Sequence, residues 1–188
     1  MPTRLLSFFF ACALAAPATA TEKLKIDASY GTIDFAIGTS KIFRTTGYFM
    51  DWKGTVKVDD TDMPGSSVEV IVNTNSIQMT DTQQTTMLKD GDFFDVERFP
   101  EMTFQSRKIE RIGENSLRVE GDVTLRGITR PMTLAVTVSD RRPDAPAGAP
   151  YARFQGFGTI KRSDFGMTKF VGMIGDTVEI SIAADARR

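Results

Sequence analysis

The stretch SLRVEGDVTLRGITRPMTLAVTV, from Ser116 to Val138, contains two runs in which apolar and polar residues alternate. A period of two places successive side chains on opposite faces of a sheet, so each run predicts a β-strand with one apolar face. Between the runs, LRGITRP has the composition of a turn. The apolar positions are Leu117 and Val119, then Val123 and Leu125, and after the turn Met132, Leu134, Val136 and Val138.

The same alternation continues through most of the chain after residue 21 and predicts an all-β fold of about eight strands in meander order. Strands with one apolar face close into an antiparallel barrel or fold into a sandwich. The supply of long apolar side chains, 14 Phe and 9 Met, favours the barrel, which has room for one ligand. Further apolar faces are Ile33, Phe35 and Ile37, then Val68, Val70 and Val72, then Met102 and Phe104, and finally Val178, Ile180 and Ile182.

Two segments interrupt this alternation of apolar and polar residues. In TDTQQTTMLK, Thr80 to Lys89, Asp81 is placed to cap a short helix that ends at Gly91, and a loop is the alternative. The second segment, SDRRPDAPAGAPY from Ser139 to Tyr151, contains three prolines, which predict an exposed, mobile loop.

The first 20 residues have the features of a secretory signal peptide. Arg4 precedes an apolar run, and Ala18-Thr19-Ala20 resembles a cleavage site. We therefore expect residues 1–20 to be removed, residues 21–188 to form one domain, and the protein to reach the periplasm. Cys12 would leave with the signal, since its surroundings fit a lipidation site poorly. Without Arg4 the chain keeps 22 of its 23 basic residues beside 24 acidic ones, a net charge of −2 that gives no reason to expect nucleic acid as a partner.

The composition argues against most enzyme classes. The chain contains no histidine, the usual general base and the commonest metal ligand. No Gly-x-Ser-x-Gly motif is present, and the acids of DDTDMPG, Asp59 to Gly65, do not have the spacing of a calcium loop. The acids Asp92, Asp95, Glu97 and Glu101 are expected to be a solvated rim rather than a glycosidase pair. We therefore expect no catalytic residues and no metal site.

Four motifs in fixed order resemble the YceI family of periplasmic, lipocalin-like proteins. They are DGDFFDVERFPEMTFQS, VEGDVTLRGITRPMTL, KRSDFGM and GDTVEISI, and the resemblance extends from about Asp27 to Asp185. It implies an extended eight-stranded antiparallel barrel with one short helix. It also implies an elongated cavity for a long apolar ligand, such as a polyisoprenoid quinone or a fatty-acid amide.

The chain departs from the family at five polar positions. Family histidines fall on Tyr30, Thr39 and Met87, and a family Arg-Asp pair falls on Gln84 and Thr85. Any role that needs a titrating group at these positions is therefore in doubt. An apolar cavity is still expected, because the flexible thioether of Met87 is a suitable lining.

We expect the inward apolar side chains to line a narrow cavity of more than a few hundred Å³, with Trp52 or Tyr30 meeting a polar headgroup at its mouth. The alternative is that the same inward side chains, including the phenylalanine rings, fill a dry core and leave no cavity. The expected ligand-binding residues are Ile33, Phe35, Ile37, Phe49, Trp52, Met87, Leu88, Phe93, Phe94, Met102, Phe104, Leu125, Leu134, Phe157, Phe165 and Met167.

The expected function is that of a periplasmic binding or carrier protein for a polyisoprenoid, an isoprenoid quinone or a fatty-acid amide. No cofactor is required, and a bound isoprenoid or isoprenoid quinone would be its ligand. Two rival functions remain open: an enzyme acting on a lipid-like substrate through Arg162, Asp164, Asp92 and Asp95, and a partner-binding barrel with a solid core. A transient contact with a membrane or a membrane redox protein, and a homodimer, also remain open.

Overall fold

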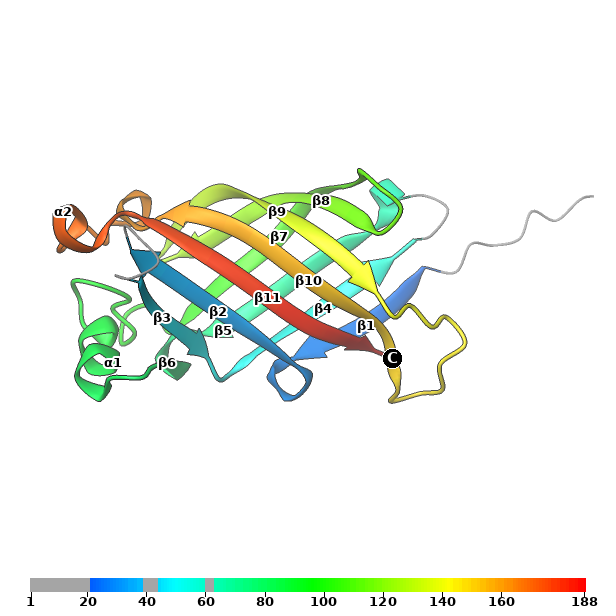
Figure 1. Ribbon diagram of the computed structural model, residues 1–188, viewed down its shortest axis with the longest axis horizontal. Coiled ribbons are helices and arrows are strands. Elements are labelled where there is room, and N and C mark those ends of the chain that lie inside the picture. The colour runs from blue at the N-terminus through cyan, green and yellow to red at the C-terminus, as the bar shows by residue number, and fades with distance from the viewer. Residues whose placement is uncertain (1–20, 39–43, 60–62) are drawn as a thin grey trace, which may run out of the picture.

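Eleven strands form one antiparallel sheet that closes on itself in the computed structural model, which describes residues 21–38, 44–59 and 63–188. The molecule is elongated along the barrel axis (Figure 1). The strands are β1 (Glu22–Asp27), β2 (Gly31–Gly38), β3 (Arg44–Phe49), β4 (Trp52–Val58), β5 (Ser67–Asn73), β6 (Ile77–Met79), β7 (Glu101–Arg111), β8 (Ser116–Leu125), β9 (Ile128–Ser139), β10 (Pro150–Lys161) and β11 (Thr177–Arg187).

Six of these eleven elements are the halves of three bent strands. Counted with the five unbroken strands, they make a barrel of eight strands. β1 and β2 both pair with β11, while β1 pairs with β4 and β2 pairs with β3. In the same way β4 pairs with β5 and β3 pairs with β6. The breaks are a 3-10 turn at Ala28–Tyr30, a bend at Met50–Asp51 and a 3-10 turn at Thr74–Ser76. The predicted all-β barrel of about eight antiparallel strands is therefore confirmed.

The hairpin between β8 and β9 has the tight turn that the sequence indicates. Leu125 pairs with Ile128, and the two residues between them have positive φ angles of 53° at Arg126 and 70° at Gly127. Positive φ at both central positions is the geometry of a type I′ turn, whose twist matches the flanking strands. The Arg126 guanidinium donates hydrogen bonds to the carbonyl oxygens of Gly91, at 2.8 Å, and Phe93. The hairpin therefore fixes the irregular segment that follows α1.

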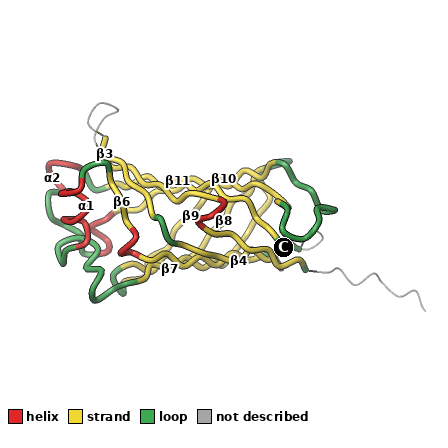
Figure 2. Tube along the Cα trace, turned by 90° about the horizontal axis from the view of Figure 1, so that it is seen from below, coloured by secondary structure: helices red, strands yellow, loops and turns green. Residues whose placement is uncertain are grey.

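The predicted helix forms as α1 (Thr82–Lys89). The Asp81 carboxylate accepts a hydrogen bond from the Gln84 N–H at 2.8 Å, which satisfies a free donor of the first turn. The helix ends at Lys89, with Asp90 as C-cap, slightly before the expected Gly91. A second helix of one turn, α2 (Val171–Ile174), was not predicted. Both helices gather at the same end of the barrel (Figure 2).

Replacing Asp81 with alanine is expected to lower the free energy of unfolding by about 1 kcal/mol, because the first turn of α1 loses its side-chain cap. Urea denaturation followed by circular dichroism measures the change. The exposed Glu97 provides the control, as Glu97→Ala removes an acid without removing a cap. Equal effects of the two substitutions would contradict the capping role.

At the opposite end of the barrel, residues 140–149 form a mostly exposed loop between β9 and β10 (Figure 1). The predicted loop is longer than this, since Ser139 ends β9, and Pro150 and the buried Tyr151 begin β10. The expected signal segment 1–20, with Cys12, lies outside the described residues, as do Asp60 and Asp62 of the calcium-like stretch. In the three ranges that are described, no helix combines the length and apolar character needed to cross a membrane.

Candidate functional site

The barrel encloses an apolar cavity of about 140 Å³. The alternating residues of the long strands converge here, and almost all the atoms that face the space are carbon. The lining consists of Ile26, Ile33, Val56, Val68, Val70, Val72, Met102, Thr103, Phe104, Ile109, Leu117, Val119, Val123, Met132, Leu134, Val136, Phe154, Gly156, Ile180, Ile182 and Ala184.

The cavity is smaller than the few hundred Å³ that the sequence predicts. A dry apolar cavity of roughly 150 Å³ accommodates a molecule the size of benzene. The space therefore fits a short section of an apolar chain. A longer guest requires the side chains around it to move, and the lining residues Met102 and Met132 are unbranched and adaptable.

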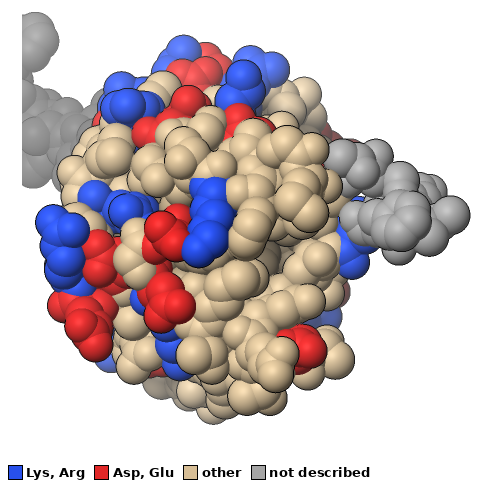
Figure 3. Space-filling model, turned by 90° about the vertical axis from the view of Figure 1, so that its left-hand side faces the viewer, with Lys and Arg blue, Asp and Glu red and all other residues tan. Residues whose placement is uncertain are grey.

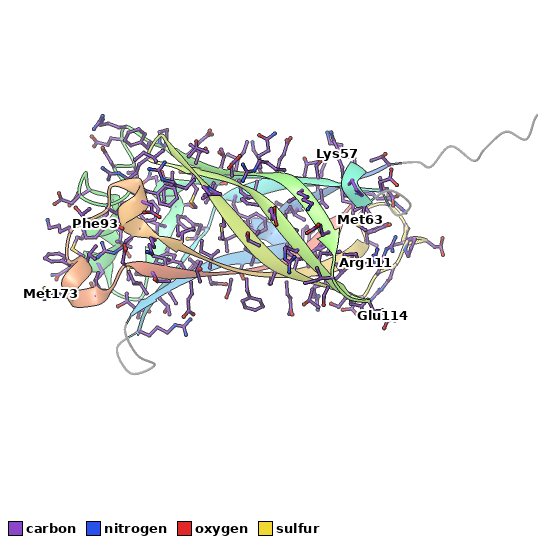
Figure 4. The ribbon with its side chains drawn as sticks, turned by 90° about the horizontal axis from the view of Figure 1, so that it is seen from above. Lys57, Met63, Phe93, Arg111, Glu114 and Met173 are labelled. Carbon is purple, nitrogen blue, oxygen red and sulfur yellow. The ribbon has the colours of Figure 1, made fainter. Side chains whose placement is uncertain are left out.

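A second pocket, of about 370 Å³, adjoins the cavity at the barrel end that carries the 140–149 loop. Four apolar side chains, Val56, Ile109, Leu117 and Phe154, line both spaces. Farther out the lining becomes polar. Figure 4 shows Lys57, Met63, Arg111 and Glu114 at this end of the barrel. We call this second space the mouth pocket.

Aromatic side chains close the other end of the barrel. Phe93, Phe165 and Met167 are buried there. The buried apolar residues of the barrel form two core clusters, and Phe94 packs against both of them. The Phe94 ring lies edge-on to that of Phe49, with centroids 5.8 Å apart. Seen end-on, charged residues of both signs gather on the left and upper parts of this end and reach its middle, while uncharged residues cover most of its right and lower parts (Figure 3). The aromatic stretch after α1 therefore acts mainly as a plug.

Fifteen of the sixteen expected ligand-binding residues separate into three groups. Four of them, Ile33, Met102, Phe104 and Leu134, line the cavity. A larger group packs in the two core clusters or the plug: Phe35, Phe49, Trp52, Leu88, Phe93, Phe94, Leu125, Phe165 and Met167. Ile37 and Met87 are half-buried and belong to neither the core clusters nor the cavity lining.

The expectation for Phe157 is wrong. Its side chain is 57% exposed and lies on the outer face of β10, opposite Ala135 and Ser181 on the neighbouring strands. The inward positions on either side of Phe157 are Gly156 and Gly158. Because Phe157 alternates with these two inward glycines, its ring points to the outside of the barrel.

Neither residue expected at the mouth lies there. Trp52 is 3% exposed in the core, and its Nε1 has no hydrogen-bond partner within the described part of the chain. Tyr30 is half exposed, and the Arg187 guanidinium lies 3.6 Å from the centre of its ring. The polar side chains beyond the apolar cavity belong instead to the mouth pocket, and Arg111 among them was not an expected site residue. The signal for it was present, because Arg111 continues the alternation of β7 two residues after Ile109.

The YceI-like domain family matches residues 24–186. The chain belongs to the YceI family. Protein YceI of Salmonella agona (strain SL483) is 31% identical over 188 residues, which covers 98% of this chain and 97% of that protein. The crystal structure of BcnA from Burkholderia cenocepacia has a TM-score of 0.73 and 26% identity, and covers 85% of this chain and 98% of that chain. A polyisoprenoid-binding domain from Saccharophagus degradans has a TM-score of 0.60 at 12% identity, and covers 89% of this chain and 99% of that one, which shows a shared fold.

Four of the five positions at which this YceI-family chain lacks the usual polar residues are described by the structure, and none of the four lines the cavity. Tyr30 is in the exposed 3-10 turn between β1 and β2, and Gln84, Thr85 and Met87 are on α1, while Thr39 is outside the described residues. The buried Thr85 hydroxyl accepts a hydrogen bond from the Met79 N–H at 3.0 Å and donates one to the Asp81 carbonyl at 3.1 Å. Thr85 therefore joins α1 to β6.

Three groups of the rival enzymatic site, Arg162, Asp92 and Asp95, form no hydrogen bond or ion pair with one another in the part of the chain that the structure describes. Asp92 pairs with Lys169, and Asp95 pairs with Arg98 at 3.2 Å. Arg162 is buried and donates to backbone carbonyls, and its burial lowers the pKa of the guanidinium. No group of acids or other ligands that could hold a metal ion occurs among the residues described.

Hydrogen bonds to a carboxylate stabilise the segment before β11. Asp176 accepts one from the Ser163 N–H at 2.9 Å and one from its hydroxyl at 2.8 Å. Chiefly through the backbone hydrogen bond, Ser163 lowers the pKa of the Asp176 carboxyl from its ordinary value of 3.8. Such a group stabilises the fold above pH 3.8, and its contribution is lost as the pH falls through the lower folded-state pKa.

Replacing Asp176 with alanine is therefore expected to lower the free energy of unfolding by about 1 kcal/mol at neutral pH. The difference from the wild type should shrink as the pH falls below 3.8. Urea denaturation at a series of pH values measures both effects. If the difference in unfolding free energy between the wild type and Asp176→Ala stays constant down to the lowest pH, the Asp176 charge does not contribute to stability.

Proposed function

We propose that this protein binds a long-chain, lipid-like amphiphile non-covalently and carries it through the periplasm. One observation supports this most directly: a closed barrel encloses a carbon-lined cavity that adjoins a polar mouth pocket. A solid barrel core would have favoured a partner-binding module instead. An apolar interior beside a polar opening matches the two chemical halves of an amphiphile.

The apolar interior provides the binding energy of the tail. Each methylene-sized group withdrawn from water contributes roughly 0.8 kcal/mol. A space of about 140 Å³ holds only part of a long tail, so the rest lies in the mouth pocket or displaces neighbouring side chains. We therefore expect the barrel to widen when it is loaded, with Met102 and Met132 changing rotamer.

Family membership supports the choice of ligand class. The related domain from Saccharophagus degradans is described as polyisoprenoid-binding, and its barrel has the same fold. Isoprenoid alcohols and isoprenoid quinones are therefore the first ligands to test, followed by fatty-acid amides. Asp92 and Asp95 are paired with other cations and not with Arg162, which gives no support to catalysis on such a ligand.

The periplasmic part of the proposal depends on residues 1–20, whose composition is that of an export signal. Expression of the full chain in a Gram-negative host, followed by cell fractionation and N-terminal sequencing, tests it. A periplasmic product that starts at Thr21 is expected. A cytoplasmic product that retains Met1 would contradict it.

Native mass spectrometry tests binding itself. The exported protein is measured as purified, after solvent extraction, and again after incubation with geranylgeraniol, an isoprenoid quinone or oleamide. Uptake of one ligand per chain is expected for at least one of the three. Extracted, folded protein that takes up none of them would overturn the proposed function.

A further inference from the structure

We infer that the mouth pocket binds an anionic headgroup, a phosphate or a carboxylate, at Arg111. The inference rests on the proposed function, because it describes the polar end of the ligand whose tail lies in the barrel. It predicts that an isoprenoid phosphate or a fatty acid binds more tightly than a neutral lipid with the same tail.

Arg111 lies where the apolar wall of the cavity ends. Ile109 lines both the apolar cavity and the mouth pocket, and Arg111 follows it by two residues on the same strand, β7. The period of a strand places both side chains on the inward face. The stem of Arg111 therefore continues the apolar wall, and its charge lies where that wall ends, at the barrel end shown in Figure 4.

The charge of Arg111 is available to a ligand. Its Nη1 donates one hydrogen bond, to the backbone oxygen of Glu114 at 3.1 Å. In the described ranges no carboxylate forms an ion pair with this guanidinium, which has five N–H donors. A guanidinium binds phosphate and carboxylate through two parallel hydrogen bonds, so the free donors favour an anion.

The other charges of the mouth pocket oppose this preference only weakly. Its lining includes three cations, Lys57, Arg111 and Arg141, and two anions, Glu114 and Asp140. Asp140 lies 3.8 Å from the guanidinium of Arg153, a residue outside the pocket lining. Lys57 follows the inward-facing Val56 and so points outward, but it adds to the positive potential. Glu114 is then the main competitor for Arg111, which makes it a second test position.

The experiment compares ligands that share a tail and differ in headgroup. Geranylgeranyl phosphate is paired with geranylgeraniol, and oleic acid is paired with oleamide. The first pair tests whether the pocket prefers a phosphate headgroup, and the second tests whether it prefers a carboxylate. Dissociation constants are measured for the wild type, Arg111→Gln, Glu114→Gln and the control Arg118→Gln. Arg118 is an exposed arginine of the adjacent strand that pairs with Glu110 across the sheet, at 3.7 Å.

In at least one pair, the anionic lipid is expected to bind the wild type about tenfold more tightly than its neutral partner, the difference that a charge-assisted hydrogen bond contributes. Arg111→Gln should abolish this preference without weakening binding of the neutral lipid. Glu114→Gln should increase it, and Arg118→Gln should leave it unchanged. Inorganic phosphate alone should not compete at the same concentrations, since it has no tail.

Each opposite result overturns a separate claim. If both members of each pair bind the wild type equally, the headgroup inference fails while the proposed function stands. An equal effect of Arg111→Gln and Arg118→Gln, or tight binding of inorganic phosphate by itself, also overturns the inference. If no lipid of either pair binds to the folded wild type, the proposed function fails with it.

Discussion

Replacing Gly156 with leucine is expected to abolish tight lipid binding while leaving the barrel folded. A Cβ atom added at Gly156 would meet Ile182 at 3.7 Å and Val136 at 3.8 Å, which are ordinary contacts. The new side chain has room because it enters the apolar cavity of about 140 Å³. Its four carbons displace a similar number of tail groups, at a cost of about 3 kcal/mol or roughly a hundredfold in the dissociation constant.

Two matched variants separate this effect from a general loss of structure. Gly158 is the next inward position of β10, but a Cβ atom there would lie 2.6 Å from Met132 and 2.9 Å from Leu134. Gly158→Leu should therefore overpack the core and lower the midpoint of thermal unfolding. Ala135→Leu adds a side chain on the outer face and should change neither property. Undiminished lipid uptake by folded Gly156→Leu would show that the ligand does not occupy the cavity.

Replacing Arg162 with methionine is expected to lower the free energy of unfolding by about 3 kcal/mol or more. The side chain is 4% exposed, and its Nε donates to the Gly175 oxygen at 2.9 Å. Its Nη1 donates to the oxygens of Met167 at 3.1 Å and Lys169 at 2.7 Å. Methionine has a similar length but no donor, so these carbonyl groups lose their partners.

Chemical denaturation measures the loss, with Arg130→Met as the control. Arg130 is an exposed arginine on β9 that donates one hydrogen bond to the neighbouring Thr129 oxygen, so its removal should change stability little. Arg162→Lys should not restore stability, because a compact ammonium cannot reproduce the wide fork of a guanidinium. A loss below about 1 kcal/mol for Arg162→Met would show that solvent replaces the guanidinium at these carbonyls.

Arg162 and Gly156 lie in different parts of the molecule, and these parts have different roles. Arg162 stabilises the plugged end, where Phe165 and Met167 are buried beside the irregular segments. Gly156 faces the cavity, which continues into the mouth pocket. A carrier needs one end that holds its shape and one end that admits the ligand. We therefore expect ligand exchange to depend on the mouth and stability to depend on the plug.

Local sequence determined the strands, their faces and the caps. The alternation of residues 116–138 predicts β8, β9 and their turn, because neighbouring residues of a strand point to opposite sides. Asp81 predicts the start of α1, since the free N–H groups of a first helical turn require a nearby acceptor. The ordered motifs also identified the family, whose domain matches residues 24–186.

Only the tertiary structure decided how the inward side chains share the interior. The volume of the cavity depends on which side chains meet across the barrel, and that is set by pairing between residues far apart in sequence. Phe94 packs in the core although it was expected to line a cavity, while Phe157 is outside because glycines occupy the inward positions beside it. The position of Arg111 at the mouth depends on where β7 ends relative to its neighbours. A period of two fixes the face on which a side chain lies, but only the closed barrel fixes what that side chain meets.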